Sequence, residues 1–130
     1  MNTANFLTIP ASIVPEQELV VFGTHRQTYH DTSRRVQRLA AALAAMGIAP
    51  GAAVAVLDTN STRYLEAYFA TSMLGGVFVP LNYRARADEL AYMILTADVR
   101  VLSSASRGMG WRSTPPPCRA RHLPSPRPAG

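Results

Sequence analysis

The sequence contains no lysine, because all 13 of its basic residues are arginines. This absence excludes mechanisms that need an ammonium group, including a Schiff base and a Walker-type phosphate loop. A single cysteine, Cys118, excludes both a disulfide framework and a cysteine-rich zinc site. No apolar run reaches the roughly 18 residues that a membrane-spanning helix needs, and no basic stretch precedes an apolar N-terminal segment. We therefore expect a soluble, cytoplasmic protein.

Acidic residues are missing from one end of the chain. Residues 1–102 hold eight arginines and eight acidic residues, so their charges balance. Residues 103–130 hold the other five arginines and six of the ten prolines but no acidic residue, and they carry the whole net charge of +5. Such a segment buries too little apolar surface to offset its chain entropy, and proline breaks helices and sheet ladders. We predict a folded segment at 1–102 and a disordered, Arg/Pro-rich tail at 103–130.

The first half of the folded segment predicts a hairpin and then a helix. After an irregular or partly helical stretch at 1–17, a short apolar run at 19–22 and the segment 27–29 flank the turn residues Gly23-Thr24. An apolar stripe with helical spacing follows, formed by Val36, Leu39, Ala40 and Leu43. Asp31 is expected to cap this helix, and Gly47 to supply the left-handed residue after its last turn.

Strands are expected at 53–57, 77–79 and 99–102, and the first two have apolar residues on both faces. The first helix between them is expected to begin at Asn60 or Ser61, and the second to have Asp88 and Glu89 in its first turn. The resulting order β-α-β-α-β-α-β predicts an α/β fold, a partial three-layer parallel sheet with helices on both faces. Three helices cover such a sheet incompletely, so we interpret 1–102 as part of a larger domain. Open strand edges would favour self-association.

Residues 28–102 resemble the N-terminal part of the AMP-dependent (adenylate-forming) synthetases and ligases, in particular the acyl-CoA synthetases. The resemblance lies in motifs spread along the segment: Thr28-Tyr29, Val36–Leu43, Gly47-Ile48, Pro50-Gly51, Val54–Leu57, Asn60, Tyr64–Ala70, Leu74–Gly76, Val79–Asn82 and Glu89-Leu90. Ala52 and Asp31-Thr32 depart from the family pattern, and nothing after Leu102 resembles it. We therefore interpret 1–102 as a partial N-terminal domain of this family.

The resemblance implies a reaction in which ATP activates a carboxylic acid as an acyl-adenylate, and the acyl group passes to coenzyme A. Family members use ATP, Mg²⁺ and coenzyme A, and they rely on lysines in a phosphate loop and in a small C-terminal domain. Fixed positive charge is needed there because negative charge develops during adenylation. A chain without lysine lacks those groups. We expect a truncated ligase that is inactive alone and binds no cofactor by itself.

One loop is a candidate binding site. Asn82, Tyr83, Arg84 and Arg86 follow a buried strand at its carboxyl end, where open α/β sheets bind ligands. In relatives this stretch lies near the coenzyme A nucleotide, and arginine forks suit phosphate oxygens. The alternative is that both arginines are merely solvated and that Asn82 caps local backbone.

Other candidates have simpler interpretations. Residues 103–110 resemble a Gly/Ser phosphate loop but lack its lysine. His25, His30 and His122 have no metal-ligand spacing, so we expect no metal site. The arginines of the tail could make weak, non-specific contacts with nucleic acid, but they are sparse. The alternative to a truncated ligase is a non-catalytic binding module with a basic tail, and no specific partner can be predicted.

Overall fold

The computed structural model describes residues 2–59, 61–104 and 110–113. Its elements follow the predicted alternation, with an added N-terminal helix and a final strand. They are α1 (Asn5–Ile13), β1 (Glu18–Phe22), β2 (His25–Thr28), α2 (Tyr29–Ala45), β3 (Ala53–Leu57), α3 (Thr62–Met73), β4 (Val77–Pro80), α4 (Ala87–Thr96), β5 (Val99–Ser104) and β6 (Gly110–Ser113).

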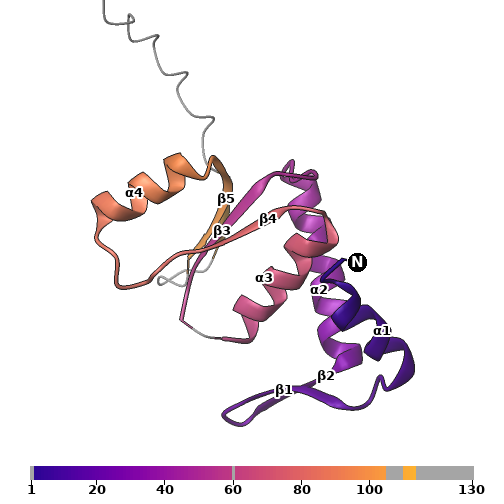
Figure 1. The fold of residues 1–130 in the computed structure, drawn as a ribbon. Coiled ribbons are helices and arrows are strands. Elements are labelled where there is room, and N and C mark those ends of the chain that lie inside the picture. The colour runs from indigo at the N-terminus through magenta and orange to yellow at the C-terminus, as the bar shows by residue number, and fades with distance from the viewer. Residues whose placement is uncertain (1, 60, 105–109, 114–130) are drawn as a thin grey trace, which may run out of the picture.

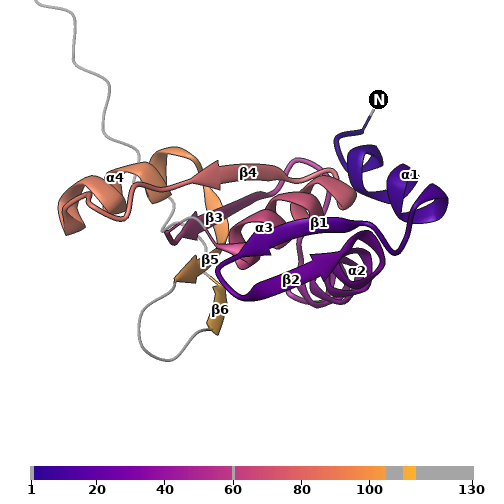
Figure 2. The same ribbon diagram turned by 90° about the horizontal axis from the view of Figure 1, so that it is seen from below.

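The central sheet has the strand order β4-β3-β5-β6, and its first three strands are parallel (Figure 1). This confirms the predicted α/β fold with a parallel sheet. One detail of the predicted order differs: β1 pairs antiparallel with β2 in a separate two-stranded sheet and does not join the parallel one. The hairpin instead lies beside α2 (Figure 2). A two-residue turn at Gly23-Thr24 favours this local pairing, because antiparallel neighbours need no crossover.

The boundary predicted at Leu102 lies too early for the sheet. β5 continues through Ser103 and Ser104, and β6 pairs antiparallel with it in a register that joins Leu102 to Arg112. This hairpin occupies residues that the composition assigned to a disordered tail. The rest of that tail, with Cys118, His122 and most of the candidate phosphate loop at 103–110, lies outside the described residues.

The beginning of α2 corrects the predicted cap. Thr28 is the N-cap residue, and its Oγ1 accepts a hydrogen bond of 3.1 Å from the Asp31 N–H. Asp31 lies inside the first turn, where a carboxylate still suits the helix dipole. Gly47 follows the helix with φ of +93°, as predicted. For α3, Ser61 is the N-cap, whereas Asn60 lies outside the described residues.

The two faces of the parallel sheet carry different helices (Figure 1). On one face, α1, α2 and α3 surround a core that includes Leu7, Leu43 and Phe69. On the other face α4 packs alone over a smaller cluster of buried residues from β3, β5 and Leu81. No residue of α4 itself is buried. Helices therefore cover both faces, as predicted, but α4 alone covers its face and has no buried residue.

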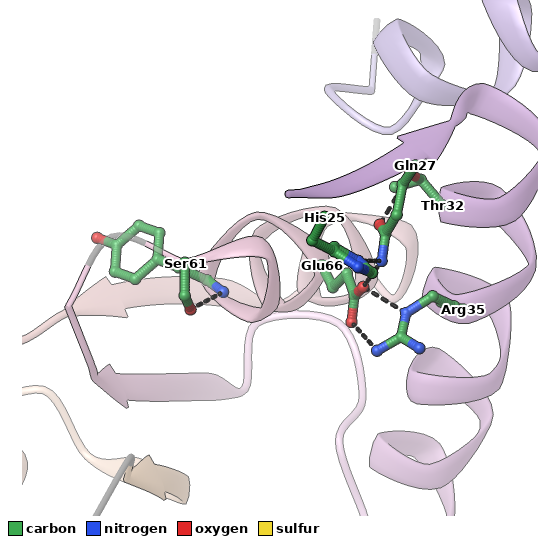
Figure 3. A network of polar contacts seen from close by, with 7 residues as sticks. His25, Gln27, Thr32, Arg35, Ser61 and Glu66 are labelled. Carbon is green, nitrogen blue, oxygen red and sulfur yellow. Dashed lines mark hydrogen bonds and ion pairs between the residues drawn. The ribbon is translucent and has the colours of Figure 1, made fainter. Parts of the chain in front are cut away.

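A polar network joins β2, α2 and α3 (Figure 3). The Glu66 carboxylate, 7% exposed, accepts hydrogen bonds from Arg35 Nε at 2.6 Å and Nη2 at 3.3 Å. Buried Gln27 donates from Nε2 to Glu66 at 3.4 Å and accepts from Thr32 Oγ1 at 3.2 Å. Hydrogen bonding and charge attraction from Glu66 raise the pKa of Arg35, so this ion pair persists well into the alkaline range. The network fixes the hairpin on the helices.

No helix in the described part of the chain is long and apolar enough to cross a membrane.

Candidate functional site

The sheet has a topological switch point at the carboxyl ends of β3 and β4. These strands are neighbours, yet the chain leaves β3 for α3 on one face and leaves β4 for α4 on the other. Open α/β sheets bind ligands in the crevice at such a point. A hollow of about 460 Å³ lies there, lined by Asp58, Thr59, Tyr64, Leu81 and Tyr83.

The β3 side of this crevice is held by Asp58, the first residue after the strand. Its carboxylate accepts hydrogen bonds from Ser61 Oγ at 3.0 Å and Thr59 Oγ1 at 3.4 Å. Ser61 Oγ in turn accepts from the Tyr64 N–H at 3.4 Å, which caps α3 (Figure 3). The Tyr64 ring packs edge-on against Phe78 of β4, with 5.3 Å between centroids. This wall is built from side chains that hold one another in place.

The β4 side is the predicted loop. Asn82 Oδ1 accepts from the Arg84 N–H at 3.0 Å, so Asn82 stabilises the local backbone, as the alternative interpretation expected. Arg84 Nε donates to Tyr83 Oη at 3.1 Å, and its guanidinium lies 5.4 Å from the centre of the Tyr83 ring. Tyr83 therefore both lines the crevice and positions Arg84.

The two arginines of the loop differ in their electrostatic surroundings. Arg86 lies 3.9 Å from Asp88, with both side chains at least 80% exposed, and such pairs contribute little. Among the described residues, no carboxylate lies within ion-pair distance of Arg84. Neither arginine lines the hollows that Asn82 and Tyr83 line. The structure thus puts Arg84 beside the crevice as an uncompensated charge, and its role toward a phosphate stays a prediction.

A second hollow, of about 560 Å³, lies on the other side of the loop against α4. Its lining includes Asn82, Asp88, Glu89 and Tyr92. Glu89 Oε2 accepts from the Arg86 N–H at 2.9 Å, which fixes the beginning of α4. Two carboxylates at its rim make this hollow a poor place for a polyanion, so the crevice beside Arg84 is the better candidate.

Asp58, Thr59 and Tyr64 were not predicted as site residues, although a signal for Asp58 and Thr59 was available. They follow β3, a strand in which every residue but Leu57 is buried, at its carboxyl end. Asn82 was selected by the same argument, although β4, expected to be a buried strand, has no buried residue. Tyr64 could not be placed in the same way, because its apolar helical spacing indicated the core. No group of three histidine, cysteine or acidic residues in the described part of the chain could hold a metal ion.

Comparison with known proteins identifies the family. The sequence pattern of the AMP-binding enzymes matches residues 10–120. The chain belongs to the AMP-binding enzyme family. The match also continues past Leu102, where the resemblance was expected to end, and it includes β5 and β6 in full.

The AMP-binding relatives include acyl-CoA ligases. A feruloyl-CoA synthase from Amycolatopsis is 42% identical over 92 residues, which cover 71% of this chain and 19% of the relative. A long-chain-fatty-acid–CoA ligase from Thermus thermophilus is 36% identical over 106 residues, covering 78% and 20%. The structure of a fatty acyl CoA synthetase from Mycobacterium tuberculosis matches with a TM-score of 0.77 at 30% identity, covering 79% and 21%. The chain spans about a fifth of the length of these relatives.

Proposed function

We propose that this chain is the N-terminal segment of an ATP-dependent acid–thiol ligase of the acyl-CoA synthetase type. The reaction would join a carboxylic acid to ATP as an acyl-adenylate and then transfer the acyl group to coenzyme A. The observation that carries the proposal is the family match over residues 10–120, together with acyl-CoA ligases among the relatives. The cytoplasmic location and self-association expected from the sequence remain part of this proposal.

The segment would contribute binding surface and not adenylation chemistry. It has no lysine to place beside a triphosphate, and the described residues form no metal cluster. What it has is a crevice at the switch point with one uncompensated guanidinium, Arg84, held against Tyr83. We propose that this loop faces the nucleotide end of coenzyme A, where a guanidinium fork would bind a phosphate.

A segment exchange tests the proposed function. The 92 matched residues of the Amycolatopsis feruloyl-CoA synthase would be replaced by those of this chain, and feruloyl-CoA formation would be measured. We expect the exchanged enzyme to form feruloyl-CoA, whereas the isolated 130-residue chain should show no carboxylate-dependent exchange of pyrophosphate into ATP. An exchanged enzyme that is folded but forms no adenylate would contradict the proposed function.

The same exchanged enzyme tests the role of the loop. Arg84→Ala should raise the KM for coenzyme A about tenfold, which is the loss expected for one charge-assisted hydrogen bond, and leave pyrophosphate exchange unchanged. Arg63→Ala is the matched control, because Arg63 is an exposed arginine on α3 that lines none of the hollows described here. Equal KM values for the two variants would remove the coenzyme A role and leave the family reaction standing.

A further inference from the structure

A groove rich in arginine lies between β2 and the first half of α2, away from the switch-point crevice. It encloses about 320 Å³, and its lining includes Arg26, Arg34, Arg35 and Arg38. Figure 1 shows the hairpin and α4 at opposite ends of the molecule. The groove is therefore distinct from the loop at Arg84, and the proposed function assigns it no role.

Two of the four guanidinium groups are held in place by carboxylates. Arg26 Nη1 lies 2.7 Å from Glu18 Oε2, across the β1–β2 hairpin. Arg35 is held by both oxygens of buried Glu66, which Gln27 also contacts at the base of the groove (Figure 3). These carboxylates fix the two side chains, but the unused N–H groups of each guanidinium can still donate to a ligand.

Arg34 and Arg38 are not compensated in this way. They lie one helical turn apart on the exposed side of α2, and no carboxylate of the described residues lies within 4.0 Å of either guanidinium. Like charges at this spacing destabilise a helix. Asp31 also lines the groove, but it forms no ion pair with either arginine. A bound anion would relieve the repulsion between Arg34 and Arg38.

His25 can add a further donor. Gln27 Oε1 accepts from Thr32, so its Nε2 amide faces His25 and donates to the ring Nε2, 2.9 Å away. In the neutral imidazole the hydrogen is then on Nδ1, which the bond to Gln27 leaves free. The groove thus combines two unpaired guanidinium groups, two positioned ones and an imidazole N–H, all of them donors.

We propose that this groove binds a phosphate-monoester dianion, either free or carried by a small organic molecule. Two guanidinium groups match the charge of the dianion, and their planar forks match its oxygens. Asp31 opposes binding by charge repulsion, which limits the affinity. Removing its charge should therefore strengthen binding. The volume of the groove is at the lower end of the range for small-molecule sites.

The test is an amide NMR titration of the full chain at constant ionic strength, with inorganic phosphate in one arm and adenosine 5′-monophosphate in the other. We expect saturable shifts confined to β2 and the first half of α2. Arg34→Ala and Arg38→Ala should each weaken binding about tenfold, whereas Asp31→Asn should tighten it several-fold. Arg63→Ala is the control. The four substituted side chains are all exposed, so the fold should persist, and a circular dichroism spectrum of each variant checks this.

The outcomes separate the sources of the phosphate and decide the proposal. Tighter binding of the nucleotide indicates an organic phosphate, and equal binding indicates the free ion. Non-saturable shifts spread over the surface would overturn the proposal, as would equal effects of Arg34→Ala and Arg63→Ala or an unchanged affinity in Asp31→Asn. Because the titration measures binding by this chain alone, its failure would leave the ligase segment proposal untouched.

Discussion

The two faces of the parallel sheet show how far a helix pattern alone specifies a core. On the face of α2 and α3, Val36 and Leu43 are completely buried because α1 and the sheet enclose them. On the other face the apolar stripe of α4 is only partly buried against the sheet, and the outer side of the helix exposes Tyr92 at 70% and Leu95 at 68%. The same strands support both helices. The difference is the number of elements packed over each face, which periodicity within one helix does not reveal.

The largest expected effect comes from opening the enclosed face. Leu43→Ala should lower the free energy of unfolding by about 2–5 kcal/mol, because Leu43 is completely buried and its truncation leaves a cavity beneath α2. Urea denaturation followed by far-ultraviolet circular dichroism measures the change. A loss below 1 kcal/mol, roughly the cost of a tolerated volume-conserving swap, would show that this face is not the stabilising core.

A smaller effect is expected from the polar network at the edge of the same face. Glu66→Ala should cost about 1–3 kcal/mol, since it leaves Gln27 without one partner and Arg35 without its carboxylate. Arg35 is half exposed and can be rehydrated, which keeps the cost below that of a fully buried pair. Glu66→Gln keeps hydrogen-bonding capacity and should recover part of the loss in the same denaturation assay.

The raised pKa of Arg35 adds a pH expectation. A base whose pKa is raised on folding stabilises the protein while it is protonated, and this contribution disappears only as pH rises through the folded-state pKa. Arginine titrates in the strongly alkaline range, so this residue should contribute no change in stability around neutral pH. A stability difference between wild type and Arg35→Met that varied between about pH 7 and 9 would contradict this assignment.

The smallest effect is expected on the outer side of α4, from the same substitution as in the first test. Leu95→Ala should change the free energy of unfolding by no more than about 0.5 kcal/mol, because the leucine is mostly solvated and alanine favours the helix. Leu43→Ala and Leu95→Ala thus form a matched pair within one chain. Equal losses in the two variants would mean that the outer side of α4 is covered as completely as the inner side of α2.

Sequence reasoning reached the parallel sheet, its three strands and the helices between them, because each depended on a local pattern. It placed the cap of α2 on Asp31 instead of Thr28, since both residues are good N-caps and only backbone geometry separates them. It also missed β6, because the proline, serine and arginine content of residues 103–130 indicated disorder, whereas a four-residue strand within them pairs with β5.

The candidate site was predicted in part for a related reason. The carboxyl end of a strand is visible in sequence, so Asn82 and Tyr83 were found, and Asp58 could have been. Which arginine lacks a carboxylate depends on tertiary geometry, which separates Arg84 from Arg86.

The hydrogen-bonding groups at the edge of β4 also depend on tertiary geometry. The N–H groups of Val77 and Leu81 donate to Ala52 and Val56 on the β3 side. The alternate residues therefore face outward, and one of them, Pro80, has no N–H to offer a second strand. If the predicted self-association occurs, this edge is poorly suited to it.

Amide hydrogen exchange on the 130-residue chain tests the contrast between the faces most directly. The account predicts that the most protected amides of α2, α3 and β3 exchange only on global unfolding, while those of α4 exchange orders of magnitude faster through local opening. Protection of α4 equal to that of α2 would contradict it, because the open face would then be as firmly closed as the enclosed one.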